Sequence, residues 1–596
     1  MTNKTAHTFH IPVMGTGYTV NTPLQVAQYG ISSVVSIVDD ILLENLREFY
    51  SKELSLPFQP ISSKTRDCRA ERITAYLNLM DKMVKDKFEE VKDSIVEKGK
   101  EFEKYMDLLP DVSTLKKEIQ DKVNNNHYLK DIKTWLNENL PLGNIDVNIM
   151  TKVDKDNFFE GEQLPSEYND AHAALRGFAN STLESSLVLS AGMNPRLYGY
   201  LEQFNDFFPN EDGYIKKKVV LKVSDYRSAL IQGKFLAKKG IWVSEYRIES
   251  GLNCGGHAFA TDGSLMGPIL EEFKNNKSDL TADTSELLYS ALQAKDRPVP
   301  EGKLELTITA QGGVGTAEEH DFLMDYYGIS SVGWGSPFLL VPEVCDVDKT
   351  TLKTLAEAKE DELFLSHSSP LGVRFNNLKG NTRNKEEVEM RKAGKLGSAC
   401  TKRLLVSNTE YTDKAICTAS RQYQNLKVED LKSQNLSEEE YGTEIEKMSQ
   451  KTCLCKGLSA ASYLVNNLET TTDGSGVAIC PGPNMAYFSE VATFKQMVDH
   501  IYGRFNLITR TDRPNMFAKE LNIYIDYLKE QISDLKDPDK KSIRNLEKFK
   551  KNLFSGIEYY NSLSDKVKGQ YDQFKDQIQK DMVKLEKELK QINILS

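Results

Sequence analysis

The sequence predicts an α/β protein: a (β/α)8 TIM barrel with a helical insertion and an additional C-terminal, mainly helical, cysteine-bearing region. Two observations carry this prediction. Short β-rich runs alternate with helical patterns over residues 9–343, as in parallel strands joined by crossover helices. Two successive strand-to-helix turns, at 311–316 and 333–336, are rich in glycine, which is typical of the loops after strands 7 and 8 that bind phosphate in such barrels.

The barrel strands are expected where β-branched and apolar residues alternate or run together. Eight such runs occur, at residues 9–13, 33–37, 147–150, 187–190, 219–223, 240–249, 304–310 and 329–332. Between the last two, residues 317–327 have apolar side chains at helical spacing, including Phe322, Leu323 and Tyr326. A helix that starts directly after a glycine turn places backbone N–H groups and a favourable dipole beside a bound anion.

At 596 residues the chain is long enough for two to four domains. Dense Lys and Glu with apolar residues at helical spacing predict a solvated helical insertion, and charged, near-heptad patterns at the C-terminus predict a long helical pair or a short coiled coil. The predicted divisions are residues 1–60 (first part of the barrel), 61–145 (helical insertion), 146–375 (remainder of the barrel), 376–505 (cysteine-containing region) and 506–596 (charged helical region).

Composition restricts the partners. A formal net charge of −11 argues against nucleic acid as the main partner. No apolar run approaches the length of a membrane span, and the N-terminus lacks a secretory signal pattern. Eight cysteines in 596 residues are not a disulfide framework. We therefore expect a cytoplasmic protein without a membrane anchor.

The segment Glu249–His257 carries the first candidate catalytic group. A histidine after two glycines at the end of a strand points toward the mouth of the barrel, where a neutral imidazole can act as an acid or a base near pH 7. The alternative is a loop histidine that bonds to a backbone carbonyl.

These pieces together resemble a known family. The ordered set IPVMGTG, SLVLSAGM, VVLKVSDYRSAL, ESG…GGH, ITAQGGVGTAEE and GWGSPFLLVPE is similar to the nitronate monooxygenase (2-nitropropane dioxygenase) family of flavin barrels. The flavin-type enoyl-acyl-carrier-protein reductases share that fold. The similarity spans about half of the chain, at residues 9–55 and 147–343.

The resemblance implies FMN as the cofactor, and His257 matches the active-site histidine of the family. The phosphate is expected at the N–H groups of Gly312, Gly313, Gly335 and Ser336. The remaining cofactor-binding residues implied are Gly15, Thr16, Ser190, Lys222 and Gly256.

One departure concerns the histidine turn. The family has an uninterrupted Glu-Ala/Ser-Gly-Gly-His, whereas here Leu252, Asn253 and Cys254 lie inside the turn. Cys254 thereby becomes a second catalytic candidate, either as an acid or as an ordinary buried thiol.

Five of the eight cysteines fall between residues 376 and 505. Clustered thiolates in a reducing compartment suit an iron–sulfur cluster or zinc, but neither spacing nor motif separates these from free thiols in a small core. The expected cluster is [4Fe–4S], held by Cys417, Cys453, Cys455 and Cys480, with Cys400 in reserve.

The expected function is that of an FMN-dependent oxidoreductase of the nitronate monooxygenase-like family, with proton transfer by a histidine beside the flavin. The substrate is a small molecule or an acyl thioester, and the electron donor is NAD(P)H or a redox protein. Two alternatives stay open: an enoyl-thioester reductase acting with NAD(P)H or a carrier protein, and a non-catalytic flavin-barrel scaffold. The helical regions could form a homo-oligomer contact.

Overall fold

The fold was obtained as a computed structural model of the full chain, which describes residues 5–97, 99–124, 129–151, 153–190, 192–469, 474–535, 539–567 and 571–594. Ala191, within the SLVLSAGM motif, lies outside the described residues. At the centre is a closed barrel of eight parallel strands, because β1 pairs with β2 on one side and with β11 on the other. This confirms the predicted fold class.

The barrel strands, in chain order, are β1 (Phe9–Ile11), β2 (Ser32–Ser36), β3 (Ile145–Ile149), β6 (Ser186–Leu189), β7 (Lys218–Val223), β8 (Val243–Glu249), β10 (Thr307–Gln311) and β11 (Ser331–Gly333). Each lies at a predicted run, although the bounds differ by a few residues. Side chains alternate between the two sides of the barrel wall. Val34, Val188 and Val220 form a small cluster of their own, separate from the main core, and are the inward-facing set.

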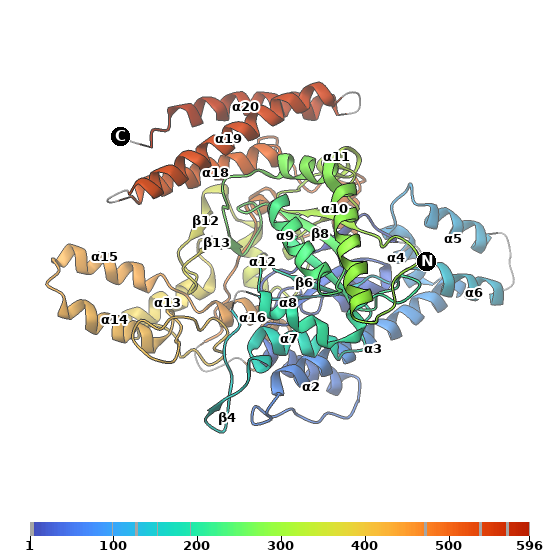
Figure 1. The fold of residues 1–596 in the computed structure, drawn as a ribbon, viewed down its shortest axis with the longest axis horizontal. Coiled ribbons are helices and arrows are strands. Elements are labelled where there is room, and N and C mark those ends of the chain that lie inside the picture. The colour runs from blue at the N-terminus through green and yellow to red at the C-terminus, as the bar shows by residue number, and fades with distance from the viewer. Residues whose placement is uncertain are drawn as a thin grey trace.

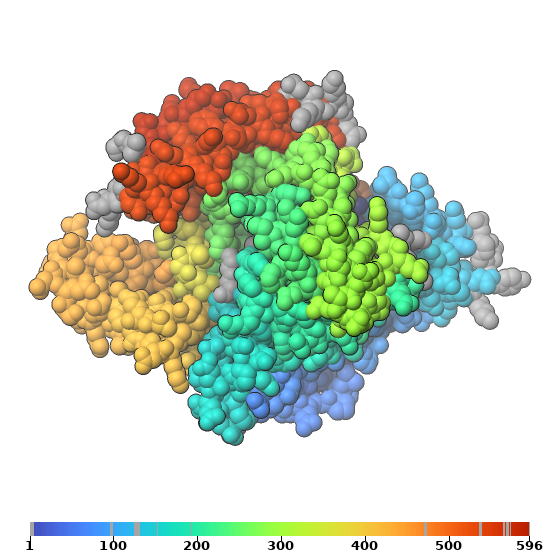
Figure 2. Space-filling view, viewed as in Figure 1, coloured from blue at the N-terminus to red at the C-terminus, as the bar shows by residue number. Residues whose placement is uncertain are grey.

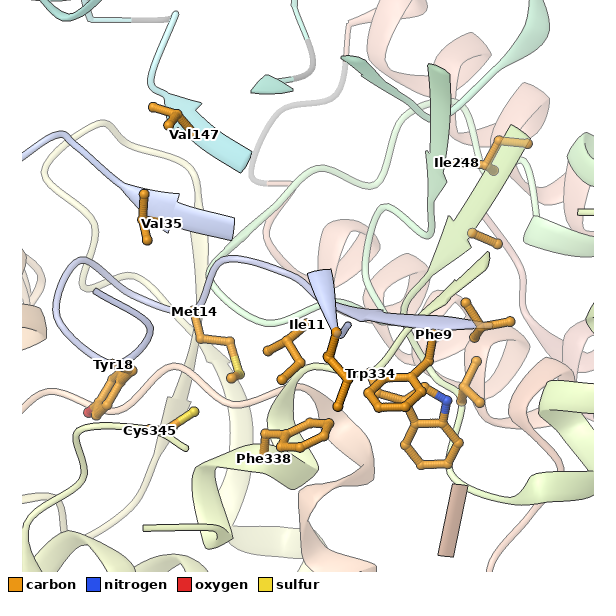
Figure 3. Packing of buried hydrophobic residues seen from close by; sticks show 14 of the residues in the cluster. Phe9, Ile11, Met14, Tyr18, Val35, Val147, Ile248, Trp334, Phe338 and Cys345 are labelled. Atoms are coloured by element: carbon orange, nitrogen blue, oxygen red, sulfur yellow. The ribbon is translucent and has the colours of Figure 1, made fainter. Parts of the chain in front are cut away.

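The outward side of the strands packs on helices. Figure 3 shows Phe9 and Ile11 of β1 beside Trp334 and Phe338, and the rings of Phe9 and Phe338 stack with centroids 6.1 Å apart. The helices that follow strands in the barrel region are α1 (Pro23–Val26), α2 (Asp40–Glu53), α7 (Asp170–Ala179), α8 (Pro195–Tyr200), α9 (Tyr226–Ala237), α10 (Met266–Ala294), α11 (Ala317–Tyr327) and α12 (Lys349–Ala356).

Helix α11 has the bounds that the sequence predicted. Thr316 caps its first turn by accepting the N–H of Glu319 at 3.2 Å, and Gly328 ends it in the left-handed conformation at φ +64°. The local signals therefore suffice to define this helix.

Four further helices lie between α2 and β3: α3 (Cys68–Glu97), α4 (Lys100–Leu108), α5 (Thr114–Asn124) and α6 (Leu129–Asn139). The long helix α3 packs against α2 and α7 beside the barrel. Helices α5 and α6 extend away from it, at the right of Figure 1.

After β11 the chain builds a second, antiparallel sheet in the order β12 (Leu363–Ser366), β13 (Arg374–Leu378) and β9 (His257–Ala258). Strand β9 comes from the loop after β8, so the barrel and the C-terminal region share this sheet. The remaining strands form a hairpin of β4 (Phe158–Phe159) and β5 (Glu162–Gln163). The short 3-10 helices are η1 (Ala27–Tyr29), η2 (Ser166–Tyr168), η3 (Leu201–Gln203), η4 (Asn205–Phe207), η5 (Ser336–Leu340), η6 (Glu360–Glu362) and η7 (Pro483–Tyr487).

The C-terminal region continues with α13 (Thr382–Lys392), α14 (Arg421–Ser433), α15 (Glu438–Ser449), α16 (Leu454–Val465) and α17 (Phe494–Ile501). It ends in three helices, α18 (Met516–Ser533), α19 (Lys540–Lys566) and α20 (Asp572–Gln591), that pack on one another. A third long helix is thus added to the predicted pair. Figures 1 and 2 show these helices in red, as a layer over one side of the molecule. Among the described residues, no helix combines the length and apolar character needed to cross a bilayer.

Candidate active site

Polar side chains gather at the barrel mouth, by which we mean the C-terminal ends of the eight strands and the loops that follow them. Lys222, Glu249 and Gln311 alternate with outer-core residues and so face the barrel interior. The Lys222 Nζ lies 3.4 Å from a Glu249 carboxylate oxygen, and the Gln311 amide donates to the same oxygen at 2.9 Å. Sequence reasoning assigned no role to either residue, although Glu249 is the last residue of a predicted strand and Gln311 is the first residue of a predicted turn.

The two glycine turns lie side by side at this mouth, because β10 and β11 are neighbours with Gln311 opposite Gly333. Gly312 and Gly313 both adopt positive φ, at +104° and +88°. Within the described chain, the N–H groups of Gly312, Gly313 and Gly335 donate to no protein acceptor. These donors are therefore available to an anion.

The start of helix α11 is not available in the same way. The buried Glu319 carboxylate accepts the Gly315 N–H at 2.8 Å and pairs with Arg513 at 2.8 Å. The helix N-terminus thus already faces a carboxylate of the chain itself. The expected dipole contribution of this helix to a bound phosphate is largely taken up by Glu319.

The extended turn after β8 brings Cys254, rather than His257, against the first glycine turn. The Cys254 thiol donates to the Gln311 carbonyl at 3.6 Å, and a Cβ placed on Gly312 would lie 2.5 Å from its sulfur. Burial raises the pKa of Cys254 far above its ordinary value, with a further contribution from Glu249, so the thiol stays protonated at neutral pH. The adjacent Asn253 lies equally close to Gly313.

His257 lies in β9, where it pairs with Phe375 of β13. Its Nε2 is 2.8 Å from the hydroxyl of the fully buried Ser369, and its ring meets that of Phe375 edge-on at 5.0 Å. The contacts described for this imidazole are therefore made with the second sheet and the C-terminal region.

A buried carboxylate supports the β8 turn from behind. Glu520 of α18 accepts the Ser250 hydroxyl at 2.5 Å and the Met266 N–H at 3.0 Å. Burial raises the pKa of Glu520 to about 7. No sequence signal indicated this residue, because it lies in a charged segment whose pattern is typical of a solvent-exposed helix.

Residues 477–484 cross the barrel mouth and join its loops. The Gly256 N–H donates to the Cys480 carbonyl at 3.2 Å, and the Gly482 N–H donates to the Ser336 hydroxyl at 2.6 Å. The Asn484 amide donates to the Gly313 carbonyl. Burial raises the pKa of Cys480 to about 12, and this cysteine lies apart from the other four of its region.

The remaining predicted cofactor residues are at the mouth as well. Gly15 takes a positive φ of +54° in the turn after β1, and Thr16 follows it. Ser190 at the end of β6 is bonded to Thr151, with their hydroxyl oxygens 2.8 Å apart. The other predicted ligands, Cys417, Cys453 and Cys455, line one small pocket together with Cys400.

Buried polar atoms without hydrogen-bond partners show which groups of FMN the barrel mouth could bind. Five side-chain oxygens here are buried and have no hydrogen-bond partner in the described structure: Thr16 Oγ1, Asn148 Oδ1, Asn253 Oδ1, Gln311 Oε1 and Asn484 Oδ1. Buried polar atoms are nearly always paired, so each such atom calls for a partner. FMN offers N–H and hydroxyl donors to such oxygens and phosphate oxygens to the glycine N–H groups, so the donor and acceptor types of these residues fit it.

Comparison with known proteins adds little. No family model matches the chain, and no curated protein matches it. Among solved structures, the chain is similar to the enoyl reductase domain of MlnA from the macrolactin biosynthesis cluster of Bacillus amyloliquefaciens. That match has a TM-score of 0.31 and 14% sequence identity, and covers 68% of this chain and 89% of that chain. A likeness of this strength defines neither a family nor an activity.

Proposed function

We propose that this chain is an FMN-dependent oxidoreductase whose site is the barrel mouth. One observation carries the proposal: N–H donors without protein acceptors and buried oxygens without donors occur together at the end of the barrel. The N–H donors suit the phosphate of FMN, and the buried oxygens suit its flavin ring and its chain of hydroxyl groups. A barrel used only as a scaffold has no need to leave both sets unsatisfied.

The chain's own residues would divide the binding. The N–H groups of Gly312, Gly313 and Gly335 would hold the phosphate, while the Asn253 and Thr16 side chains would meet the hydroxyl and ring atoms. When bound, FMN supplies the acceptance and donation of hydride.

Lys222 supplies the positive charge of the site. Its ammonium group lies at the inner rim, and Glu249, itself held by Gln311, keeps it there. Fixed charges that face a site from which water is excluded stabilise negative charge that develops during reaction. We assign Lys222 this electrostatic role.

The two predicted catalytic residues receive different roles. Cys254 packs against the glycine turn as a protonated thiol, and its high pKa makes it a weak acid near neutral pH. His257 is assigned as a positioning residue, because its bond to Ser369 ties the β8 loop to the second sheet. The substrate class is a small molecule or an acyl thioester, and the electron donor is NAD(P)H or a redox protein.

The absorption spectrum of the purified full-length protein tests the cofactor. A bound flavin gives visible absorption, and the flavin released on denaturation should be FMN by chromatography. A colourless protein that takes up no FMN when the cofactor is added would overturn the proposal.

Turnover then separates the remaining alternatives. Oxidation of NADH or NADPH that depends on an unsaturated acyl thioester would identify an enoyl-thioester reductase. Bound FMN that is reduced by neither nicotinamide nor a reduced carrier protein would instead identify a flavin-binding scaffold.

A further inference from the structure

Four cysteines that are distant in sequence meet around one pocket. Cys400, Cys417, Cys453 and Cys455 line it together with Lys402 and Lys456. They come from three segments: Cys400 from the loop after α13, Cys417 from the loop before α14, and Cys453 and Cys455 from the start of α16. Cys417 and Cys455 are buried and the other two are half-buried, so the pocket lies just beneath the surface. Chance burial of thiols in a core would not gather four of them at one opening.

Backbone N–H groups lie beside three of these thiols. The N–H of Arg403 lies near Cys400, that of Lys456 near Cys453, and that of Ala419 near Cys417. Cys400 and Arg403 both take positive φ, at 54° and 55°, which non-glycine residues rarely adopt. Hydrogen bonds to sulfur favour the thiolate, which is the form that binds metal, and they tune iron–sulfur centres.

Basic side chains lie at the pocket as well. Lys402 and Lys456 are both buried in its wall, and the fully buried Arg383 acts on Cys453. Lys402 and Arg383 already pair with the carboxylates of Asp39 and Glu386, so they offset only part of the charge that several thiolates would bring into a low-dielectric site.

The spacing of the sulfurs distinguishes between metal groups. Among the described residues, no three of these sulfurs lie within 4.8 Å of one another. A single tetrahedral zinc ion with bonds of about 2.3 Å would hold all four sulfurs about 3.8 Å apart. A cluster, in which each of four irons takes one thiolate, holds the sulfurs farther apart and does not require such a compact group of three.

The pocket lies against the barrel mouth. Helix α16 starts at Leu454, and one turn later the Leu458 carbonyl accepts the N–H of Gly17, in the turn after β1, at 3.0 Å. Cys455 precedes Leu458 by three residues, and an α-helix rises only about 4.5 Å over three residues. Lys402 adds a second connection, because its Nζ bonds to both Asp39, after β2, and Ser459.

We propose that Cys400, Cys417, Cys453 and Cys455 ligate a [4Fe–4S] cluster that passes single electrons to the group bound at the barrel mouth. The ligand set departs from the sequence expectation, because Cys400 takes the place given there to Cys480. A reduced one-electron carrier protein gives up each electron, and two such transfers with two protons balance one two-electron reduction of a flavin. The transfer of electrons to the barrel mouth rests on the proposed function, whereas the binding of the cluster does not.

The test uses the full-length chain, purified anaerobically and reconstituted with ferrous iron and sulfide. We expect about four iron and four sulfide per chain, as a [4Fe–4S] cluster demands, with visible absorption and a paramagnetic signal on reduction. Each of Cys400→Ser, Cys417→Ser, Cys453→Ser and Cys455→Ser should lower cluster content about tenfold or more, since second-shell losses alone cost that much at metal sites. Thermal unfolding of each variant before reconstitution shows whether it is folded.

Cys480→Ser and Cys68→Ser are the matched controls and should keep the full iron content. Zinc bound one to one without uptake of iron, or folded wild-type protein that binds no iron, would overturn the proposal. So would a Cys480→Ser variant that loses the cluster while Cys400→Ser retains it. Flavin is measured separately: cluster without FMN defeats the proposed function alone, and FMN without cluster defeats this inference alone.

Discussion

The backbone N–H of Gly17 donates to the carbonyl of Leu458 at 3.0 Å, so the turn that follows the first barrel strand touches the helix that carries Cys455. The two segments are more than four hundred residues apart in sequence. Their contact brings the cysteine pocket next to the barrel mouth, and it is one of the connections between the two sites, beside that of Lys402 to Asp39.

Gly17→Ala should break this contact. A Cβ at this position would lie 2.9 Å from Ser459 Cα and 3.1 Å from the Leu458 oxygen, both backbone atoms that cannot move alone. We expect a loss of about 1–3 kcal/mol in the free energy of unfolding, as for other overpacked sites, measured by urea denaturation. Gly199→Ala, with no heavy atom within 4 Å of its Cβ, is the control and should be no less stable than wild type. Equal losses in both variants would contradict the argument.

Lys222→Met tests the charge at the barrel mouth. The substitution keeps the length of the side chain but removes the ammonium group beside Glu249. We expect turnover to fall by about a hundredfold or more, as when one preorganised donor is removed from a site that stabilises developing charge. Steady-state kinetics measure this, with Lys234→Met on the surface of α9 as a control at wild-type rate. An unchanged rate in Lys222→Met with FMN bound would remove the assigned role.

His257→Ala and Ser369→Ala distinguish positioning from proton transfer. Both remove the same 2.8 Å bond between the imidazole and the buried hydroxyl. If His257 only positions the β8 loop, the two variants should lower turnover to a similar extent and leave the shape of the pH–rate profile unchanged. Loss of one limb of the profile in His257→Ala alone would restore the histidine as the acid or base.

Local signals in the sequence were enough for the barrel but not for the contacts between distant segments. The alternation of side chains in a strand and the helix cap at Thr316 depend only on residues close in sequence, so the strands and α11 could be predicted. The sheet of β9 with β13 could not, because β9 is two residues long and its partner lies over a hundred residues away. For the same reason, spacing alone could not show that Cys400, rather than Cys480, lines a pocket with Cys417, Cys453 and Cys455.

Glu520→Gln should change how stability depends on pH. Burial raises the pKa of this carboxyl from 4.5 to about 7, so the folded chain holds the proton more tightly than the unfolded chain. Its contribution is full below pH 4.5 and is lost as the pH rises through about 7. Glutamine keeps the neutral form at all pH values, and above pH 7 the variant should be more stable than wild type by up to about 3 kcal/mol.

Denaturation series between pH 4.5 and 8 measure this difference. The exposed Glu389→Gln serves as the control and should stay within about 0.5 kcal/mol of wild type at every pH. Parallel stability curves for wild type and Glu520→Gln would show that the buried carboxyl does not titrate in this range.

Arg513→Ala should destabilise the first glycine-rich turn, at residues 311–316, through its buried partner Glu319. Arg513 and Glu319 pair at 2.8 Å with side chains 6% and 2% exposed, and the same carboxylate holds the N–H groups of Gly315 and Met516. Removing the arginine leaves a buried charge without its cation, which costs about 3–5 kcal/mol. Because the arginine also donates to the Gly313 carbonyl at 3.2 Å, FMN binding should weaken in the same variant.

Adding Glu319→Gln to Arg513→Ala removes the unpaired charge and should recover part of the lost stability, so the double variant is expected to be more stable than Arg513→Ala alone. FMN affinity should not recover to the same degree, because the contact to Gly313 stays absent. Urea denaturation and FMN titration on wild type, Arg513→Ala and the double variant separate the two effects. A double variant less stable than Arg513→Ala would show that Glu319 stabilises the turn mainly through its N–H partners rather than through the ion pair.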